Sequence, residues 1–317
     1  MVKIYDGFIF DNEFELLELR LQEHWDYIHK FILVESKVDH RNQPKPLYYA
    51  DNRSRFAPWS DKIRHVVLEN FQDNGPWEFK KTNSGNIQEQ QRNMIPWGSY
   101  DADKEDILLI CDVDEIWRRE ALQYIIDKPA HLLYSPKQMM SHFKLNFVCK
   151  TYETTDLCHG YMSWSKGIQI GWFKDCYNFD ATCVKAIDQF STISEIGPRA
   201  DWQAIIQHGG WHFSWWGDWQ DHIRKLDSYG HIEQDTLEVR ELMSNNQLIS
   251  SKLSDRSSVP QIGNLFPEHD WTICEVDDYY PNTITSNLTK YRRHILPNPS
   301  GKITDFLPQF PLGSTGV

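Results

Sequence analysis

The chain has 317 residues, with 45 acidic and 33 basic side chains and a formal net charge of −12 at pH 7. Proteins that bind nucleic acid carry a stripe of basic residues that contacts the phosphates. The excess of acidic residues therefore argues against a nucleic-acid-binding protein. The longest strictly apolar run is Ile107 to Cys111, and a membrane-spanning helix needs about 20 such residues, so we expect no membrane span. The first residues lack a signal-peptide pattern, so we expect a cytoplasmic protein unless a leader has been removed.

The first 128 residues alternate between strand-like and helix-like segments. Short apolar runs predict strands at 3–10, 31–35, 64–69 and 107–112. Helices are predicted from Phe14 onward, where Asn12 and Glu15 fit a capping box, and at 86–97 and 118–127. This β-α-β alternation predicts an α/β fold with a parallel, doubly wound sheet.

The remaining segments are less regular. Residues 37–60 and 70–86 are long, polar and contain proline and glycine, as is typical of binding loops or lids. Five tryptophans lie between residues 202 and 219, and such a cluster either packs in a core or forms flat walls for sugar rings. Further helices are predicted at 218–229 and 236–250, and we expect the tail beyond 251 to wrap the surface or to be partly disordered.

The sequence Asp112-Val113-Asp114-Glu115 directly follows the strand predicted at 107–112. In open α/β sheets, ligands bind beyond the carboxyl ends of the strands. Asp112 and Asp114 are two residues apart and would project to the same side of an extended chain. Two adjacent carboxylates repel each other unless a cation lies between them, and a divalent ion that also binds phosphate oxygens would serve. A solvated acidic turn is the alternative interpretation.

A second candidate segment runs from His208 to Gly217, with the sequence HGGWHFSWWG. His208 and His212 have the spacing of a helical metal pair, but the two glycines between them make a helix improbable. One histidine that enters a shared metal site is more plausible, and a histidine packed in an aromatic core is the alternative.

Two weaker candidates lie near predicted strands and helices. Arg92 could pair with a phosphate or orient an aspartate, and Asn93 could bond a base or ribose. Glu35 and Ser36 end the second predicted strand, where a nucleotide base would lie in a doubly wound sheet. GxGxxG, GxxxxGK[ST] and GxSxG motifs are absent, which argues against dinucleotide binding, P-loop ATPases and α/β-hydrolases.

Five stretches of the sequence together resemble glycosyltransferase family 17. They are YDGFIFDNEFELLELRLQEHWDYIHKFILVES, KPLYY, QRN, CDVDEI and GGWHFSWWG, in order across about residues 3–230. Known members are β-1,4-mannosyl-glycoprotein β-1,4-N-acetylglucosaminyltransferases. The resemblance implies a GT-A fold, a UDP-sugar donor, a divalent metal (typically Mn²⁺, or Mg²⁺) and inversion at the anomeric carbon. It aligns Asp112 and Asp114 with the DxD motif and His212 with the histidine of the GWHxSW block.

The resemblance also implies that different parts of the chain have different roles. Residues 1–128 would form the nucleotide-sugar-binding half of a Rossmann-like GT-A domain, 129–233 its aromatic-rich acceptor half, and 234–317 a C-terminal helix and wrapping tail. Asp114 would bind the metal directly, Asp112 would bind it through water or hold the ribose, and His212 would complete the shell. Arg92 would stabilise charge on the leaving diphosphate.

Inversion needs one carboxylate base near the acceptor hydroxyl. Asp201 is the first candidate because it precedes the aromatic block, and the alternatives are Glu115, Asp218 and Asp221. We expect transfer from UDP-GlcNAc to a glycan or glycoconjugate hydroxyl. The vertebrate members carry a membrane anchor that we do not expect here, so the acceptor stays open. The alternative functions are a sugar-nucleotide pyrophosphorylase and a non-catalytic carbohydrate-binding protein.

Overall fold

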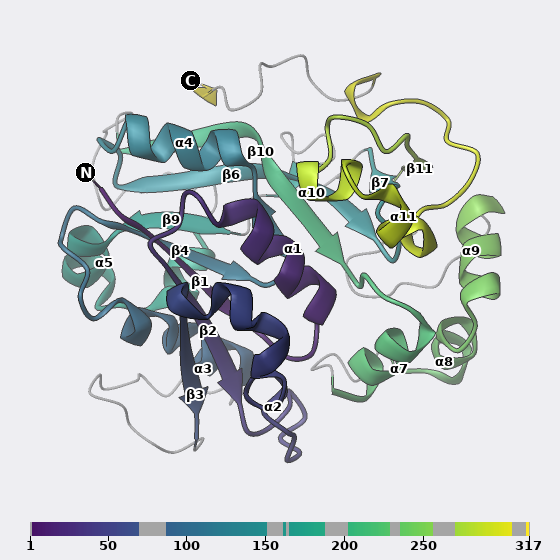
Figure 1. Cartoon of the computed structure of the whole chain (residues 1–317), viewed down its shortest axis with the longest axis horizontal. Coiled ribbons are helices and arrows are strands. Elements are labelled where there is room, and N and C mark those ends of the chain that lie inside the picture. Colours follow the sequence, from purple (N-terminus) through teal and green to yellow (C-terminus); the bar gives the residue numbers. More distant parts are fainter. Residues whose placement is uncertain are drawn as a thin grey trace.

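The computed structural model describes residues 2–69, 87–150, 161–162, 165–187, 202–228, 235–255, 270–305 and 315–316. Twelve strands of these residues join in one sheet. Its parallel part has the order β3-β2-β1-β4, formed by β1 (Ile4–Ile9), β2 (Lys30–Ser36), β3 (Ile63–Leu68) and β4 (Ile107–Asp112). These are the four strands that the sequence predicts, and their parallel pairing confirms the Rossmann-like α/β fold (Figure 1).

The sheet continues beyond β4 with strands that run in both directions. β9 (Lys166–Gln169) lies antiparallel between β4 and β6 (Leu133–His142), and β7 (Phe147–Cys149) and β11 (Trp271–Ile273) complete that edge. β10 (Gln203–Ser214) pairs parallel with β6 and antiparallel with β5 (Glu115–Trp117). The short strands β8 (Tyr161–Met162) and β12 (Thr315–Gly316) pair with β6 and β10. Residues 208–214 are therefore in a strand and not in a helix, which agrees with the expectation from the glycine pair, and Trp211 is the tryptophan of the cluster that lies in it.

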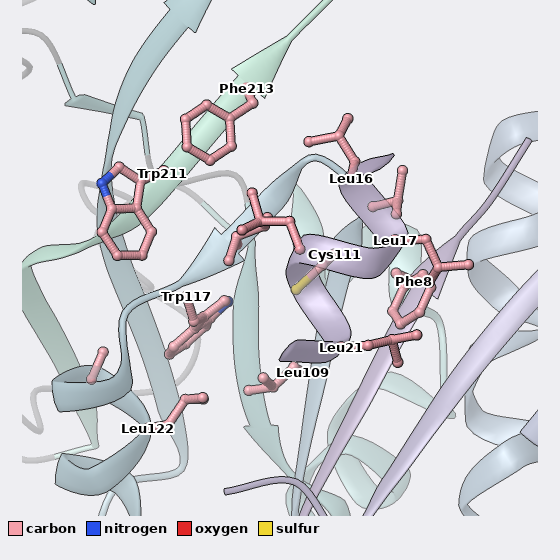
Figure 2. Close-up of a cluster of buried hydrophobic side chains, with 14 of the residues drawn as sticks. Phe8, Leu16, Leu17, Leu21, Leu109, Cys111, Trp117, Leu122, Trp211 and Phe213 are labelled. Atoms are coloured by element: carbon pink, nitrogen blue, oxygen red, sulfur yellow. The ribbon is translucent and has the colours of Figure 1, made fainter. Parts of the chain in front are cut away.

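Helices cover both faces of the sheet, each over its own hydrophobic core. On one face, α1 (Phe14–His24) and α4 (Arg119–Asp127) pack against β1, β4 and β10. Figure 2 shows Leu17 and Leu21 of α1 beside Phe8, while Trp117 and Trp211 fill the space toward α4. On the other face lie α3 (Ile87–Asn93), the 3₁₀ helix η2 (Ile95–Ser99), α5 (Ile170–Tyr177) and α6 (Ala181–Lys185).

A third cluster of buried apolar side chains joins the far edge of the sheet to three helices. These are α7 (Trp219–Ser228), α8 (Leu237–Met243) and α9 (Asn246–Asp255). The sequence predicts a single helix at 236–250, and this prediction is wrong. Asn245 ends it, because its side-chain oxygen accepts hydrogen bonds from the backbone N–H groups of Gln247 and Leu248 and so starts a new helix.

Two further local predictions are wrong for identifiable reasons. Residues 37–60 are not one long loop, because α2 (Tyr48–Asp51) and the 3₁₀ helix η1 (Arg53–Lys62) form where Tyr49 and Phe56 are buried against α1. The capping box at α1 does not form. Glu15 instead bonds Arg293 (2.5 Å) and His294 (2.8 Å) of the C-terminal segment.

The described part of the C-terminal segment does not only wrap the surface but also adds a strand to the sheet. β11 joins the sheet edge, and α10 (Asn282–Thr285), α11 (Leu288–Tyr291) and the 3₁₀ turns Arg292–His294 and Ile303–Asp305 follow it.

The predicted loop at 70–86 lies outside the described residues. Among the helices that the structure describes, none combines the length and apolar character needed to cross a bilayer. The three-part division of the chain and the cytoplasmic location stay predictions.

Candidate functional site

A cavity of about 250 Å³ lies at the carboxyl ends of β1 and β4. Six segments supply its charged wall: the turn after β1, residues 39–45, α3, the turn after β4, β10 and α7. The wall residues that carry charge or bind metals include Asp11, Glu13, Arg92, Asp112, Asp114, His212 and Lys225. A parallel sheet brings these strand ends to one edge, so the cavity lies where the sequence predicts a ligand site.

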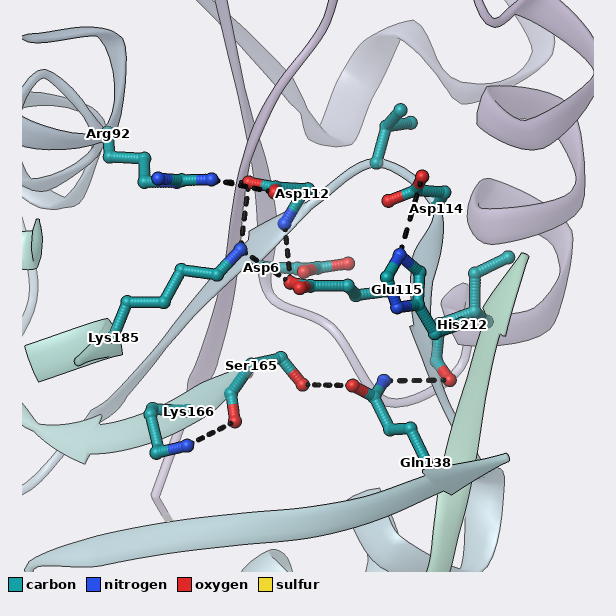
Figure 3. Close-up of polar contacts among 12 residues, drawn as sticks. Asp6, Arg92, Asp112, Asp114, Glu115, Gln138, Ser165, Lys166, Lys185 and His212 are labelled. Carbon is teal, nitrogen blue, oxygen red and sulfur yellow. Dashed lines mark hydrogen bonds and ion pairs between the residues drawn. The ribbon is translucent and has the colours of Figure 1, made fainter. Parts of the chain in front are cut away.

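Asp112, the last residue of β4, is held by two cations. The Arg92 guanidinium donates from Nε to Oδ1 (3.1 Å) and from Nη2 to Oδ2 (2.8 Å), and Lys185 Nζ lies 2.8 Å from Oδ1 (Figure 3). Burial alone would raise the pKa of Asp112, but the positive charges of Arg92 and Lys185 hold it well below its usual range. Asp112 is therefore an ionised carboxylate with both oxygens engaged.

Asp114 takes a different partner, because the chain turns between β4 and β5. Its Oδ2 lies 3.6 Å from His212 Nε2, and both side chains line the cavity. Burial would raise the pKa of Asp114, but the neighbouring His212 lowers it. The same pair raises the pKa of His212 against the effect of burial. The antiparallel pairing of β10 with β5 sets His212 opposite Glu115 and so brings it beside this turn.

Arg20 of α1 holds the backbone of the turn that carries both aspartates. Arg20 Nη1 donates to the backbone carbonyls of Asp112 (3.2 Å) and Glu115 (2.8 Å), and the guanidinium also pairs with the fully buried Asp6. The second oxygen of Asp6 also contacts His24, whose Nδ1 lies 2.8 Å from Oδ2. Burial would raise the pKa of Asp6, but Arg20 and His24 lower it to about 2. This buried ion pair joins β1 and α1 to the backbone of the site.

The residues after β1 form the opposite wall of the cavity. Glu13 Oε2 accepts hydrogen bonds from the backbone N–H groups of Asp11 (3.1 Å) and Asn12 (3.0 Å). Burial raises the pKa of Glu13 despite the positive charge of Lys225, and the negative charges of Asp11 and Asp114 add to this. Asp11 pairs with Lys45 at 2.8 Å.

The segment 37–46 also contributes to the cavity wall, through Asp39, His40 and Lys45. Arg41 anchors this segment to the helical cluster by bonding Asp235 (2.9 Å) and the carbonyl of Leu226. This stretch of residues 37–60 therefore lies against the cavity, and its role as a binding segment stays a prediction.

The tryptophan cluster divides between core and site. Trp211 and Trp216 are buried in the main core, whereas Trp215 lines the cavity and Trp219 is 40% exposed. Trp215 has a φ of +54°, a left-handed conformation that bulky residues rarely adopt. The Nζ of Lys225 lies 5.4 Å from the centre of its ring, and His222 Nε2 bonds its carbonyl at 2.9 Å. Trp215 is itself only 2% exposed and belongs to the apolar cluster around α7, α8 and α9, so the core interpretation holds for Trp211, Trp215 and Trp216, and a wall for sugar rings stays a prediction.

Several predicted site residues have other contacts. Glu35 is buried, accepts the Tyr49 N–H (2.8 Å) and pairs with His65 (2.7 Å). Ser36 Oγ accepts the Val38 N–H at 3.1 Å. Neither Glu35 nor Ser36 lines the cavity.

Asn93 also lies off the cavity wall, and its side-chain oxygen accepts the Thr182 N–H at 3.1 Å. It thereby ties α6 to α3.

The candidate bases are also dispersed. Glu115 is fully buried, accepts the Asp112 N–H (2.7 Å) and pairs with Lys185 (2.8 Å), so it does not reach the cavity wall. Asp218 pairs with Arg293 at 3.1 Å, and Asp221 accepts the Asp218 N–H at 2.9 Å. Asp201 lies outside the described residues.

Sequence reasoning missed Lys185, Lys225, Arg20 and the acidic pair after β1. Asp11 and Glu13 follow a predicted strand, so the rule that located Asp112 could also have found them. Arg20, Lys185 and Lys225 lie on helices without a motif, and only the tertiary structure brings them to the site.

A divalent ion requires several oxygen or nitrogen ligands around one point. Within the described ranges, no three His, Cys, Asp or Glu side chains are grouped so that they could hold a metal ion. Asp114 and His212 supply a carboxylate and an imidazole at the cavity wall, a donor pair that suits Mn²⁺. An ion that binds a diphosphate takes its other ligands from phosphate oxygens and water. The pair therefore fits a metal that arrives with a phosphorylated substrate.

Comparison with solved structures gives distant similarities. HddC from Yersinia pseudotuberculosis complexed with GMP-PN has a TM-score of 0.33 and 10% identity, over 55% of this chain and 80% of that chain. A second structure of HddC has a TM-score of 0.34 and 11% identity, over 65% and 90% of the two chains. The inositol-1-phosphate CTP transferase from T. maritima has a TM-score of 0.32 and 9% identity, over 56% and 76%.

No curated protein matches the chain. The model of one protein family does match, over residues 1–161, which include β1, β2, α3 and the Asp112–Glu115 turn. This match covers half of the chain and agrees with the resemblance seen in its motifs. The chain belongs to glycosyltransferase family 17.

Proposed function

We propose that this glycosyltransferase moves a sugar, with GlcNAc as the expected one, from a UDP-sugar to a hydroxyl of a glycan or glycoconjugate, with inversion and with a divalent metal. The observation that carries the proposal is the cavity at the carboxyl ends of β1 and β4. It combines the cations Arg92 and Lys225 with the Asp114–His212 pair. A diphosphate binds where positive charge is available. A metal ion bound to the diphosphate also needs protein ligands, such as a carboxylate or an imidazole.

Asp114 and His212 would hold the metal, which would supply positive charge to the diphosphate as the glycosidic bond breaks. Arg92 faces the same cavity and would bind a phosphate oxygen of the donor. Burial would lower the pKa of Arg92, but Asp112 raises it, so the guanidinium stays charged at every pH of interest. Trp215 offers an apolar wall on which a sugar ring can pack.

Transfer with inversion is a single displacement. The acceptor oxygen forms a bond to the anomeric carbon while the bond to the donor phosphate oxygen breaks, and the electron pair leaves with UDP. A carboxylate base takes the hydroxyl proton. Asp201 remains our first candidate for this base. Glu115, one of the three alternatives, is fully buried and pairs with Lys185, which argues against direct contact with an acceptor.

A donor screen tests the proposal. The full chain is incubated with Mn²⁺, a panel of acceptor glycans and UDP-GlcNAc, UDP-glucose, UDP-galactose or GDP-mannose in parallel, and free nucleoside diphosphate is measured together with the product. We expect acceptor-dependent release of UDP that stops in EDTA and returns with Mn²⁺ or Mg²⁺. Full activity in EDTA would contradict the metal part of the proposal. Pyrophosphate formation from a nucleoside triphosphate and a sugar phosphate would support a pyrophosphorylase instead.

A further inference from the structure

Lys185 joins two carboxylates that flank the metal-binding candidate Asp114 in the sequence. Its Nζ lies 2.8 Å from Asp112 Oδ1 and 2.8 Å from Glu115 Oε2, and its side chain is only 9% exposed. Glu115 Oε2 also accepts the N–H of Asp112 at 2.7 Å, so the three residues form a closed ring of contacts. Figure 3 shows Lys185 and Arg92 approaching Asp112 from the same side, while Asp114 points toward His212.

The cluster formed by Arg92, Asp112, Glu115 and Lys185 has two positive and two negative charges. Within it, Arg92 and Asp112 line the cavity, whereas Glu115 and Lys185 lie behind them. Removal of one partner from such a buried set leaves a charge without compensation, so its members hold one another in position. Lys185 can therefore act on a ligand in the cavity only through Asp112 and Arg92.

The helices that carry the two cations are themselves joined. Asn93, next to Arg92 on α3, accepts the backbone N–H of Thr182 on α6 at 3.1 Å. The Thr182 hydroxyl donates to the Glu89 carbonyl at 3.5 Å. α6 thus presents Lys185 to Asp112 in a fixed relation to the helix that presents Arg92.

We propose that Lys185 is a positioning residue of the donor site, which fixes Asp112 and through it holds the Arg92 guanidinium toward a nucleoside diphosphate in the cavity. This inference rests on the proposed function. Two physical effects follow. Loss of Lys185 removes one of the two cations that hold Asp112, so the carboxylate can shift together with the Arg92 guanidinium that it orients. It also makes the wall behind the cavity more negative, which opposes the binding of a diphosphate.

The test measures UDP binding by calorimetry at a fixed Mn²⁺ concentration, together with the KM for the donor and kcat. Lys185→Met should weaken UDP binding by about 10–100-fold, the usual effect of losing a residue that orients a ligand-binding group. The donor KM should rise more than kcat falls. Lys185→Arg keeps the charge and should retain most of the affinity.

Lys185→Met also leaves Glu115 buried without its cation, so the variant can lose stability for that reason alone. The double variant Lys185→Met/Glu115→Gln removes both charges and should recover the melting temperature while UDP binding stays weak. Lys62→Met is the matched control. Lys62 donates to the carbonyls of Trp25 and Ile28 and does not line the cavity, so its loss should lower stability and leave UDP affinity unchanged.

The outcomes separate the two proposals. The double variant has no added negative charge, so it tests the positioning of Asp112 alone. If it binds UDP as tightly as the wild type, Lys185 does not position the donor site and the inference is wrong, while transfer by the wild type still supports the proposed function. A wild type that binds no nucleoside diphosphate overturns the proposed function and the inference together. Weak UDP binding by a stable double variant, with affinity retained in Lys185→Arg, supports the inference.

Discussion

Asp112 and Asp114 lie two residues apart but differ in the charges that surround them. Asp112 is bonded by Arg92 and Lys185, whereas Asp114 Oδ2 lies 3.6 Å from His212 Nε2 and is also influenced by the charge of Lys225. A divalent ion at Asp114 needs His212 in its neutral form, and the 3.6 Å contact that it would replace is longer than either ion pair of Asp112. At Asp112 it would have to displace a cation first. The two carboxylates therefore have separable roles.

This difference predicts opposite results for two isosteric substitutions. Asp114→Asn removes the charged ligand and should lower Mn²⁺ affinity by about 10–100-fold and abolish transfer, with little change in melting temperature. Asp112→Asn should leave Mn²⁺ affinity in the absence of UDP nearly unchanged. It should cost about 2 kcal/mol of stability, because Arg92 and Lys185 lose their shared anion. Calorimetry with Mn²⁺ alone and thermal unfolding measure both effects. Equal losses of Mn²⁺ affinity in the two variants would show that both carboxylates bind the ion.

The sequence located the residues of this site better than their partners. Asp112 and Asp114 could be predicted because a buried strand followed by acidic residues puts those residues at the carboxyl edge of a parallel sheet. Their pairing with Arg92, Lys185 and His212 depends on how α3, α6 and β10 pack, and no local pattern encodes that packing. For the same reason Glu35 was a plausible base-binding residue by position, but His65 of the neighbouring strand and the Tyr49 backbone engage it.

At the scale of elements, β10 carries His212 to the site and depends on glycine for its position. A Cβ on Gly210 would lie 2.2 Å from the carbonyl oxygen of Ile116 and 3.0 Å from the Cα of Trp117, both on β5. Only glycine allows the two strands to approach this closely. The spacing of β5 and β10 in turn sets His212 beside the turn that bears Asp114.

We therefore predict that Gly210→Ala destabilises the protein and weakens the site at once. Because the clash is with backbone, the loss of stability should reach at least the upper end of the roughly 1–3 kcal/mol typical of overpacking. Gly167→Ala on β9 is the control, since its Cβ would meet side chains and not backbone, those of Leu109 at 3.0 Å and Trp117 at 3.3 Å. Unfolding in urea gives both free energies. A smaller loss for Gly210→Ala than for Gly167→Ala would contradict the proposed strand contact.

Elements were predicted well where the local pattern and the tertiary structure agree. All four parallel strands and the helices α1, α3 and α4 follow from apolar runs and periodicity. The capping box failed because Arg293 and His294, far along the chain, compete for Glu15. The helix α2 and the 3₁₀ helix η1 were not predicted, because their sequence is rich in polar residues and contains a proline. Two aromatic side chains, Tyr49 and Phe56, anchor these helices in the core.

At the scale of the whole molecule, one buried and one partly exposed set of ion pairs connect distant parts of the chain and make its stability depend on pH. Asp6 joins β1 to α1, and Glu15 joins α1 to the C-terminal segment. The pKa of each is lowered to about 2, against burial, by Arg20 and His24 for Asp6 and by His294 and Arg293 for Glu15. These carboxylates stabilise the fold fully above their ordinary pKa values near 4. That contribution is lost as the pH falls toward 2.

His222 adds a pH dependence at higher pH. Its Nε2 bonds the Trp215 carbonyl (2.9 Å), and its Nδ1 is buried with no hydrogen-bond partner among the described residues. Burial, together with the positive charges of Lys144, Lys225 and His294, lowers its pKa to about 3. An unfolded chain takes up this proton near pH 6.5, whereas the folded chain does so only near pH 3. Protonation in this window therefore favours unfolding.

We predict that the wild type loses on the order of 3 kcal/mol of stability through His222 as the pH falls from 6.5 toward 3. His222→Gln keeps an N–H donor for the Trp215 carbonyl but does not titrate, so its stability should change much less between pH 6.5 and 4.5. Below pH 4 both proteins should lose stability together, because Asp6 and Glu15 become protonated in each. Urea unfolding at pH 7.0, 5.5, 4.5 and 3.5 measures these slopes. Parallel curves for wild type and variant above pH 4.5 would show that His222 does not titrate as its buried position implies.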